Sequence, residues 1–272
     1  MWRVSAEPVV FVAAWLALAG PARADQPLWE AGVGVGALRL PDYRGADHSR
    51  SWVLPVPYIV YRGDILKADR DGARAVLLDT ERVDFDISVA ATAPARSRDN
   101  TARQGMPDLP ATFEIGPNLN LTLARGRWWK LQARVPLRAA LTIESHPRMI
   151  GWRTEPNLNL DTKVGGWNAS LLAGPVFGSR AFNGHLYDVA PQYATPARPS
   201  YRAGAGFGGW RLVASTSRRL GSWWFGGFIG ADSVEGAVYQ ASPLVRRHDT
   251  LAFGVALSRV FATSAQQVSD EH

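Results

Sequence analysis

Apolar and polar residues alternate with a period of two along several long segments of the chain. From Trp129 to Ile143 the odd positions are apolar, whereas most even positions are polar or charged. The same alternation runs through 83–89, 113–123 and 152–161. A period of two is typical of a β-strand with two unlike faces. Soluble β-sandwiches alternate too, but their strands usually have about five or six residues. Several segments here keep phase for about ten, the length a tilted strand needs to cross a bilayer.

This pattern predicts an all-β, antiparallel transmembrane β-barrel. The predicted strands are 29–40, 51–61, 64–69, 73–79, 82–93, 113–125, 128–144, 150–163, 167–178, 201–219, 222–234 and 250–261. Short turns such as Gly165-Gly166 alternate with longer links such as 94–111 and 179–200. This asymmetry is typical of outer-membrane barrels, which have short periplasmic turns, long outer loops and, with an even strand count, both termini in the periplasm. Twelve strands are predicted, or ten if the weak hairpin at 64–79 belongs to a loop.

The first 24 residues have the pattern of a secretory signal peptide. Arg3 supplies a basic start, Val9 to Ala19 is apolar, and Ala22-Arg23-Ala24 fits a small-x-small cleavage site. The apolar run is well short of the roughly 20 residues that a membrane-spanning helix needs. The sequence therefore predicts a signal peptide at 1–24, a barrel at 25–261 and a polar tail at 262–272.

Composition agrees with an exported β-protein. The 272 residues include 26 Gly, 11 Trp and no Cys, which excludes disulfides and thiolate metal sites. The formal charge is +6, from 30 basic and 24 acidic residues. Without the leader, which holds Arg3, Arg23 and Glu7, the balance is 28 minus 23, or +5. These charges are spread along the chain and form no basic stripe, so a nucleic-acid partner is not expected.

Charged residues gather on the face of the predicted strands that points into the barrel. The predicted lumen-facing charges are Glu114, Lys130, Arg134, Arg138, Arg153, Glu155 and Asp161, with Asp84, Asp86 and Lys163 in the same orientation. Both signs are present, so these side chains are expected either to pair across strands and plug the interior or to line a narrow aqueous pathway. Pairing is the simpler interpretation, because buried charges need partners.

Neither the histidines nor the glycine runs predict catalysis. His48, His146, His185 and His248 fall in predicted outer loops and His272 in the tail, and no pair has metal-site spacing. Gly32-Val33-Gly34-Val35-Gly36 resembles part of a dinucleotide-binding fingerprint, but it lies inside a predicted strand with no helix after it. Close packing of strands is the expected reason for these glycines. No catalytic residue, cofactor or metal is therefore predicted.

Three short motifs suggest a family. They are Leu40-Pro41-Asp42-Tyr43-Arg44-Gly45-Ala46-Asp47, then Leu54-Pro55-Val56-Pro57-Tyr58, and later Ala241-Ser242-Pro243-Leu244-Val245. In order and spacing they resemble the MltA-interacting protein (MipA/OmpV) family of outer-membrane proteins. The resemblance implies a scaffold that links a murein-synthesising enzyme to a lytic transglycosylase. One departure is the C-terminus, because such barrels commonly end on an aromatic residue and here Phe261 is followed by the tail.

Three functions follow, together with expected contacts to outer-membrane lipid. A scaffold without enzymatic activity would hold murein enzymes through its periplasmic turns. A small porin-like channel would use the charged lumen, and a lipid-modifying enzyme with loop histidines is the weaker alternative. Basic residues of the predicted outer loops are further expected to contact anionic lipopolysaccharide: Arg44, Arg50, Arg96, Arg98, Arg103, Arg198, Arg246 and Arg247.

Overall fold

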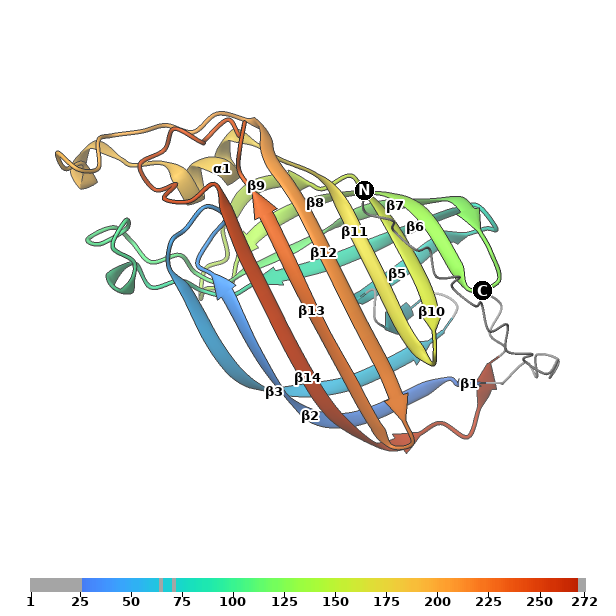
Figure 1. Cartoon of the computed structure of the whole chain (residues 1–272). Coiled ribbons are helices and arrows are strands. Elements are labelled where there is room, and N and C mark those ends of the chain that lie inside the picture. The colour runs from blue at the N-terminus through green and yellow to red at the C-terminus, as the bar shows by residue number, and fades with distance from the viewer. Residues whose placement is uncertain (1–25, 64–65, 70–71, 269–272) are drawn as a thin grey trace, which may run out of the picture.

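The chain forms an antiparallel β-barrel in a computed structural model that describes residues 26–63, 66–69 and 72–268 (Figure 1). The strands of the wall are β2 (Trp29–Pro41), β3 (Ser49–Arg62), β4 (Leu66–Asp69), β5 (Gly72–Asp79), β6 (Val83–Thr92), β7 (Thr112–Arg125), β8 (Trp129–Thr142), β9 (Met149–Thr154), β10 (Asn157–Val164), β11 (Trp167–Gly178), β12 (Gly206–Leu220), β13 (Trp223–Ser233) and β14 (Asp249–Thr263). Strand β14 pairs with β2 and closes the wall.

Strands β9 and β10 are two segments of one strand, because both pair with β8 on one side and with β11 on the other. Counted in this way, the described part of the wall has twelve strands. The predicted fold class and strand count are confirmed. The hairpin of β4 and β5 belongs to the wall and not to a loop.

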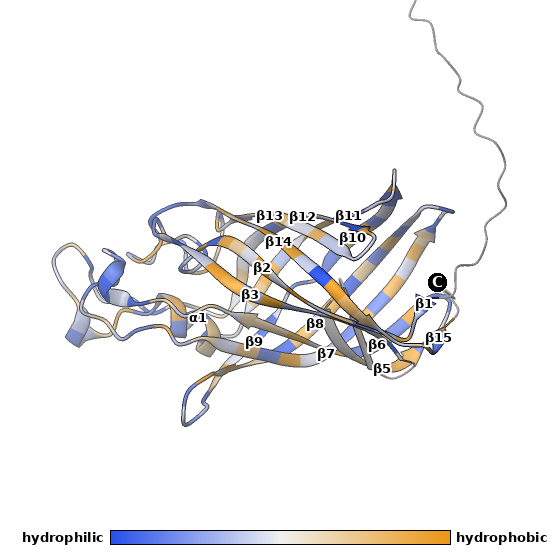
Figure 2. Cartoon of the chain, turned by 90° about the horizontal axis from the view of Figure 1, so that it is seen from below, coloured by the Kyte–Doolittle hydropathy of each residue, from blue (hydrophilic) through white to orange (hydrophobic). Residues whose placement is uncertain are grey.

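The outer face of the barrel is apolar. Val53, Phe261 and Val255 expose 73%, 69% and 66% of their surface, whereas Glu114 and Asp161, on inward-facing positions, expose 1% and 4%. The alternation is visible as changes of colour along single strands (Figure 2). Exposure of such an apolar face to water is unfavourable, whereas contact with lipid hydrocarbon is favourable. The wall is therefore expected to lie in a bilayer.

Two predicted elements differ from the structure. The predicted strand 150–163 is interrupted at Glu155 and Pro156, because proline has no N–H to give to the ladder. The predicted strand 201–219 begins only at Gly206. The loop predicted at 179–200 contains helix α1 (Arg180–Tyr187), whose first turn is capped by Ser179 accepting from the Phe182 N–H, and a 3₁₀ turn (Pro191–Tyr193). A second 3₁₀ turn spans Ser97–Asp99.

The glycine run of β2 serves strand packing. A Cβ on Gly34 would lie 2.1 Å from the Leu257 carbonyl oxygen and 2.2 Å from the Ser258 hydroxyl. Only glycine allows β14 to approach this closely. The observed packing is the role expected for these glycines.

Both ends of the described chain lie at one end of the barrel. Strand β1 (Gln26–Pro27) pairs with β15 (Gln267–Val268), and β14 continues two residues beyond Phe261 to Thr263. The predicted signal peptide, residues 1–24, lies outside the described residues, as does the end of the predicted tail. No helix in the described ranges is long and apolar enough to span a membrane.

Candidate functional site

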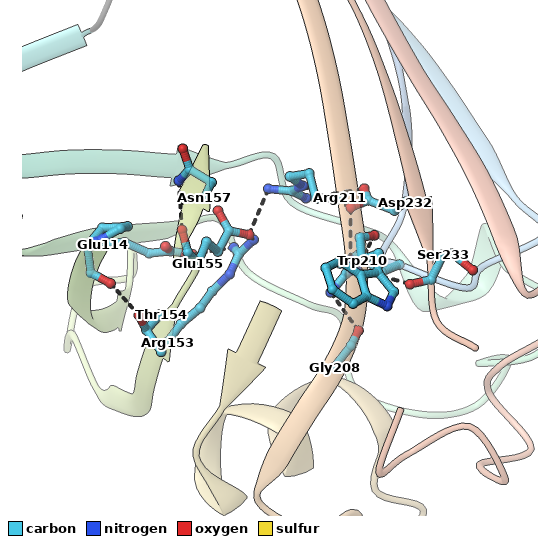
Figure 3. Close-up of polar contacts among 12 residues, drawn as sticks. Glu114, Arg153, Thr154, Glu155, Asn157, Gly208, Trp210, Arg211, Asp232 and Ser233 are labelled. Carbon is cyan, nitrogen blue, oxygen red and sulfur yellow. Dashed lines mark hydrogen bonds and ion pairs between the residues drawn. The ribbon is translucent and has the colours of Figure 1, made fainter. Parts of the chain in front are cut away.

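A chain of alternating charges crosses the barrel from β7 to β13. Arg153 donates to Glu114 Oε1 at 3.1 Å and also to Glu155. Glu155 accepts from Arg211 at 3.0 Å, and Arg211 in turn donates to Asp232 at 2.8 Å. These side chains come from β7, β9, the break after β9, β12 and β13, and they meet in the interior (Figure 3). Every charge in this group, which we call the lumen cluster, has a partner of opposite sign.

Arg44 joins the lumen cluster from the outer loop. Its Nε donates to Asp232 at 3.0 Å, and its other nitrogens donate to the carbonyl oxygens of Gly208 and Trp210. The side chain is only 12% exposed. Arg44 therefore ties the loop after β2 to the top of β12 and β13.

The other predicted lumen charges lie on the same side of the barrel. Arg134 lies 3.3 Å from Asp161, which also accepts from Asn159. Arg138 donates to the Ser88 hydroxyl at 3.0 Å, and Lys130 stands opposite Asp161 in the strand register. Asp86 is 1% exposed and accepts from the amide groups of Asn118 and Asn120. The structure thus brings Glu114, Arg153 and Glu155 together and places Arg134 and Asp161 in a neighbouring pair.

Sequence reasoning missed three members of the lumen cluster and a second charged group at the other end of the barrel. Arg211 alternates with Trp210 and Leu212, so its inward orientation could have been predicted from the period of β12. Glu30 pairs with Arg62 at 2.7 Å and with Arg219. No sequence signal indicates these partners, because they are distant in the chain.

The outer end of the barrel is covered by packed loops, which we call the cap. Tyr187 of α1 stacks on Tyr239, with ring centroids 3.7 Å apart, and meets the edge of Tyr43 at 5.9 Å. The Tyr43 hydroxyl donates to the Leu244 carbonyl, and the Ser242 hydroxyl donates to the Tyr187 carbonyl. Buried residues of four outer loops join this core: Ala46, Ala95, Ala102, Leu109, Val189, Ala203, Val234 and Ala237.

Two of the family-like motifs, residues 40–47 and residues 241–245, lie side by side in the cap. Asp42 is almost fully buried and accepts from Arg50 at 2.9 Å, from Asn100 at 2.9 Å, and contacts His48 at 3.0 Å. Gly45, at φ +85°, receives the Arg246 and Arg247 backbone N–H groups on its carbonyl. That positive φ is a conformation other residues rarely adopt. Pro41 ends β2 and Pro243 lies beside Ser242, whereas Pro55, Pro57 and Tyr58 lie in β3.

Several arginines predicted to contact lipopolysaccharide are used inside the protein. Arg44 and Arg50 hold carboxylates, Arg103 is 3% exposed, and Arg198 donates to the carbonyl oxygens of Tyr193, Ala102 and Gln104. Their guanidinium groups are therefore engaged. A lipopolysaccharide contact stays a prediction for Arg96, Arg98, Arg246 and Arg247.

The histidines do not converge on a metal or a catalytic group. His146 contacts the Ser145 hydroxyl at 3.3 Å in an exposed loop, and His248 contacts Gln240 at 3.4 Å. Within the part of the chain that the structure describes, no group of three or more His, Asp or Glu is placed to hold a metal ion.

The cap contains one histidine that makes its stability sensitive to pH. Burial, and then the charges of Arg103 and Arg148, lower the pKa of His185 from its usual value of about 6.5. The unfolded segment takes up a proton more readily than the packed one. The contribution of the neutral His185 side chain to the stability of the cap is therefore fully present above about pH 6.5. This contribution is lost as the pH falls through the lowered pKa.

We expect the amide protection factors of α1 to decrease as the pH is lowered from about 7.5 to about 5.5. Protection factors correct for the intrinsic effect of pH on exchange. In a His185→Gln protein they should stay level over the same range. Equal pH dependence in both proteins would contradict this role of His185.

The antiparallel barrel wall, its apolar outer face and the charges in its interior together define an outer-membrane β-barrel protein. Residues 33–261 match the family model described as MltA-interacting protein MipA. The chain belongs to this family, and its location is the outer membrane.

Solved structures similar to this chain are barrels of low sequence identity. The COG4313 outer membrane channel from Pseudomonas putida F1 matches with a TM-score of 0.45 and 11% identity, over 90% of this chain and 100% of that chain. Outer membrane phospholipase A from Escherichia coli, as an active-site mutant, matches with a TM-score of 0.35 and 9% identity, over 89% of this chain and 94% of that chain. The CymD monoaromatic hydrocarbon channel matches with a TM-score of 0.35 and 11% identity, over 87% of this chain and 89% of that chain. At these TM-scores none bears on function. No curated protein matches the sequence.

Proposed function

We propose that this protein is a non-enzymatic scaffold of the outer membrane, whose barrel is closed along its axis and whose periplasmic rim holds murein enzymes. The observation that carries the proposal is the pairing of charges across the lumen directly beneath a packed cap. Arg153, Arg211 and Arg44 each bridge two separate parts of the chain through carboxylates or carbonyl groups. Such a network occupies part of the cross-section that a water-filled pore would need.

The name of the family model supports the choice of partner. It describes a protein that interacts with MltA. In this chain the rim nearest both described ends presents the exposed residues Glu81 and Arg127 in short turns and the β1–β15 pair. On this proposal that rim faces the periplasm, and its partners are a murein synthase and a lytic transglycosylase.

Site-specific photo-crosslinking in intact cells tests the scaffold. A photoreactive residue in place of Arg127 is expected to capture a murein synthase or a lytic transglycosylase. The matched control is the same residue in place of Ala197, an exposed position in the cap, which should capture neither. Capture from Ala197 alone would contradict the proposed orientation, and capture from neither position would contradict the scaffold.

A small channel is the second candidate, because Arg134 and Arg138 lie on the polar side of the lumen. The two functions separate in a planar bilayer. The scaffold predicts no discrete conductance from the full chain. Discrete steps that change when Arg134 or Arg138 is replaced by glutamine would support the channel instead.

A further inference from the structure

One part of the barrel wall lacks strand pairing. Strand β3 pairs with β2 along its whole length, from Pro41 opposite Ser49 to Trp29 opposite Tyr61. On its other edge, within the described ranges, it pairs with β4 only at Tyr61 and Arg62. Strand β6 pairs with β5 from Asp84 to Ser88, and its outer residues, 89–92, pair only with β7 as far as the description extends. The outer half of the wall between β3 and β6 is therefore open, and we call this interval the side opening.

The sequence of β3 is adapted to an open edge. The Arg62 N–H donates to the Leu28 carbonyl, on the side of β2. Because N–H groups alternate sides along a regular strand, those of odd-numbered residues point toward the side opening. Pro55 and Pro57 occupy two of these positions and have no N–H to leave unsatisfied. Two prolines in succession on this side fit an edge that has no partner there.

The side opening lies at the depth of the hydrocarbon region. Pro55 stands opposite Val35 and Pro57 opposite Val33 in the register of β2. Val33 and Val35 are 55% and 51% exposed on the outer face, as are Val53 and Ile59 of β3, at 73% and 63%. These four side chains mark the apolar band that contacts lipid. What enters through the side opening therefore comes from the membrane.

On the β3 side of the side opening the interior is apolar, unlike the lumen cluster, whereas the inward positions of β6 include Asp86 and Ser88. The inward-facing residues of the middle of β3 are Trp52, Leu54, Val56, Tyr58 and Val60. Leu54 is 44% exposed although it faces inward, and Phe228 of β13, also inward-facing, is 39% exposed. Between the end groups Glu30 and Asp232, the inward positions of β13, β14 and β2 carry no charge. We call this side of the lumen the apolar chamber.

The apolar chamber is bounded at both ends. At the inner end the rings of Tyr58 and Trp224 lie 5.6 Å apart, beside the charges of Glu30, Arg62 and Arg219. At the outer end of β3 there is a cavity of about 800 Å³ between the strand and loop 94–110. Its lining includes Trp52 from the chamber side and the basic side chains His48, Arg50 and Arg96: the remaining residues are Ser49, Ser51, Pro94, Ala95, Asp99, Asp108, Leu109 and Pro110.

We infer that the apolar chamber binds the hydrocarbon chain of a long-chain fatty acid, which enters from the membrane through the side opening. The hydrocarbon chain of the fatty acid lies along β3 against Leu54, Val56 and Phe228. Its carboxylate lies in the outer cavity near Arg96, whose side chain is exposed there. A single chain fits an interior that is apolar on one side only. The inference does not depend on the scaffold proposal, because it concerns the lumen and not the periplasmic rim.

Photo-labelling of the full chain in lipid nanodiscs tests the inference. A palmitic acid probe with a diazirine in its chain is expected to label Leu54, Val56 and Phe228, which face inward. A photoreactive probe of any membrane lipid is expected to label outward-facing residues such as Val53 and Val255. Labels confined to outward residues would overturn the inference. Equal inward labelling by a two-chain phosphatidylethanolamine probe would overturn the choice of ligand.

Two variants and one control place the ligand in the chamber. Leu54→Glu puts a carboxylate against the chain and should lower inward labelling about tenfold. Gly230→Leu fills the chamber: a Cβ there meets its nearest neighbour, Val213, at 3.6 Å, an ordinary contact, so folding is expected to persist. Thr122→Glu, an inward position on the polar side of β7, should leave labelling unchanged. Unchanged labelling in Gly230→Leu, or an equal loss in Thr122→Glu, would overturn the inference.

Discussion

Replacing Arg153 with methionine is expected to lower the free energy of unfolding of the barrel by about 3–5 kcal/mol. The guanidinium is the shared partner of Glu114 and Glu155, and Glu114 is only 1% exposed. Without Arg153 the Glu114 carboxylate stays buried and loses the guanidinium that donates to it. The expected measurement is urea-induced unfolding of the purified protein in lipid vesicles, followed by tryptophan fluorescence.

Two further variants separate the loss of charge pairing from a general loss of arginine. The double variant Arg153→Met with Glu114→Gln should recover part of the lost stability, because the amide costs less to bury than an unpaired carboxylate. Arg148→Met is the matched control, since the Arg148 side chain is 68% exposed and pairs with the half-exposed Glu144, and such pairs contribute at most about 1 kcal/mol. A loss of that small size in Arg153→Met would show that the lumen cluster does not hold the barrel together.

The strands of this barrel could be predicted from the sequence because the two environments of a membrane barrel act on every second residue. Lipid selects Trp129, Leu131 and Val135 on one face of β8, and the lumen selects Lys130 and Arg134 on the other. The same alternation indicated which charges face inward. It could not indicate which of them pair, because Arg211 and Glu155 are brought together by the curvature of the wall and not by their spacing in the chain.

The cap could not be predicted, because no periodic environment shapes it. Residues 40–47 and 241–245 were associated only as parts of a family pattern, and the structure gives the physical reason for both. Tyr43 and Gly45 of the first segment hold Leu244, Arg246 and Arg247 at or just beyond the second. Likewise, Pro55 and Pro57 carried a signal for an open strand edge. The two prolines can be interpreted in this way only when the strands that pair with β3 are known.

Replacing Tyr187 with alanine is expected to unpack the cap while the barrel persists. Tyr187 is 1% exposed, stacks on Tyr239, and donates its hydroxyl to the Arg44 carbonyl at 2.9 Å. Truncating such a buried aromatic residue costs about 3–5 kcal/mol. Because the strands of the wall pair independently of α1, this loss should fall on the loops. The open population of the cap should therefore rise at least about a hundredfold.

Trypsin added to intact cells measures this opening. In Tyr187→Ala we expect rapid cleavage after Arg180 and Arg198, which the packed cap of the parent protein protects through contacts with Asp188 and with the Tyr193 carbonyl. Tyr193→Ala is the matched control, because Tyr193 is only half-buried at the edge of the same core and its loss leaves the stack intact. Equal cleavage in both variants would mean that the tyrosine stack does not hold the cap. Protection in both, with cleavage only after the cells are opened, would mean that the cap faces the periplasm, and the proposed orientation of the barrel would have to be reversed.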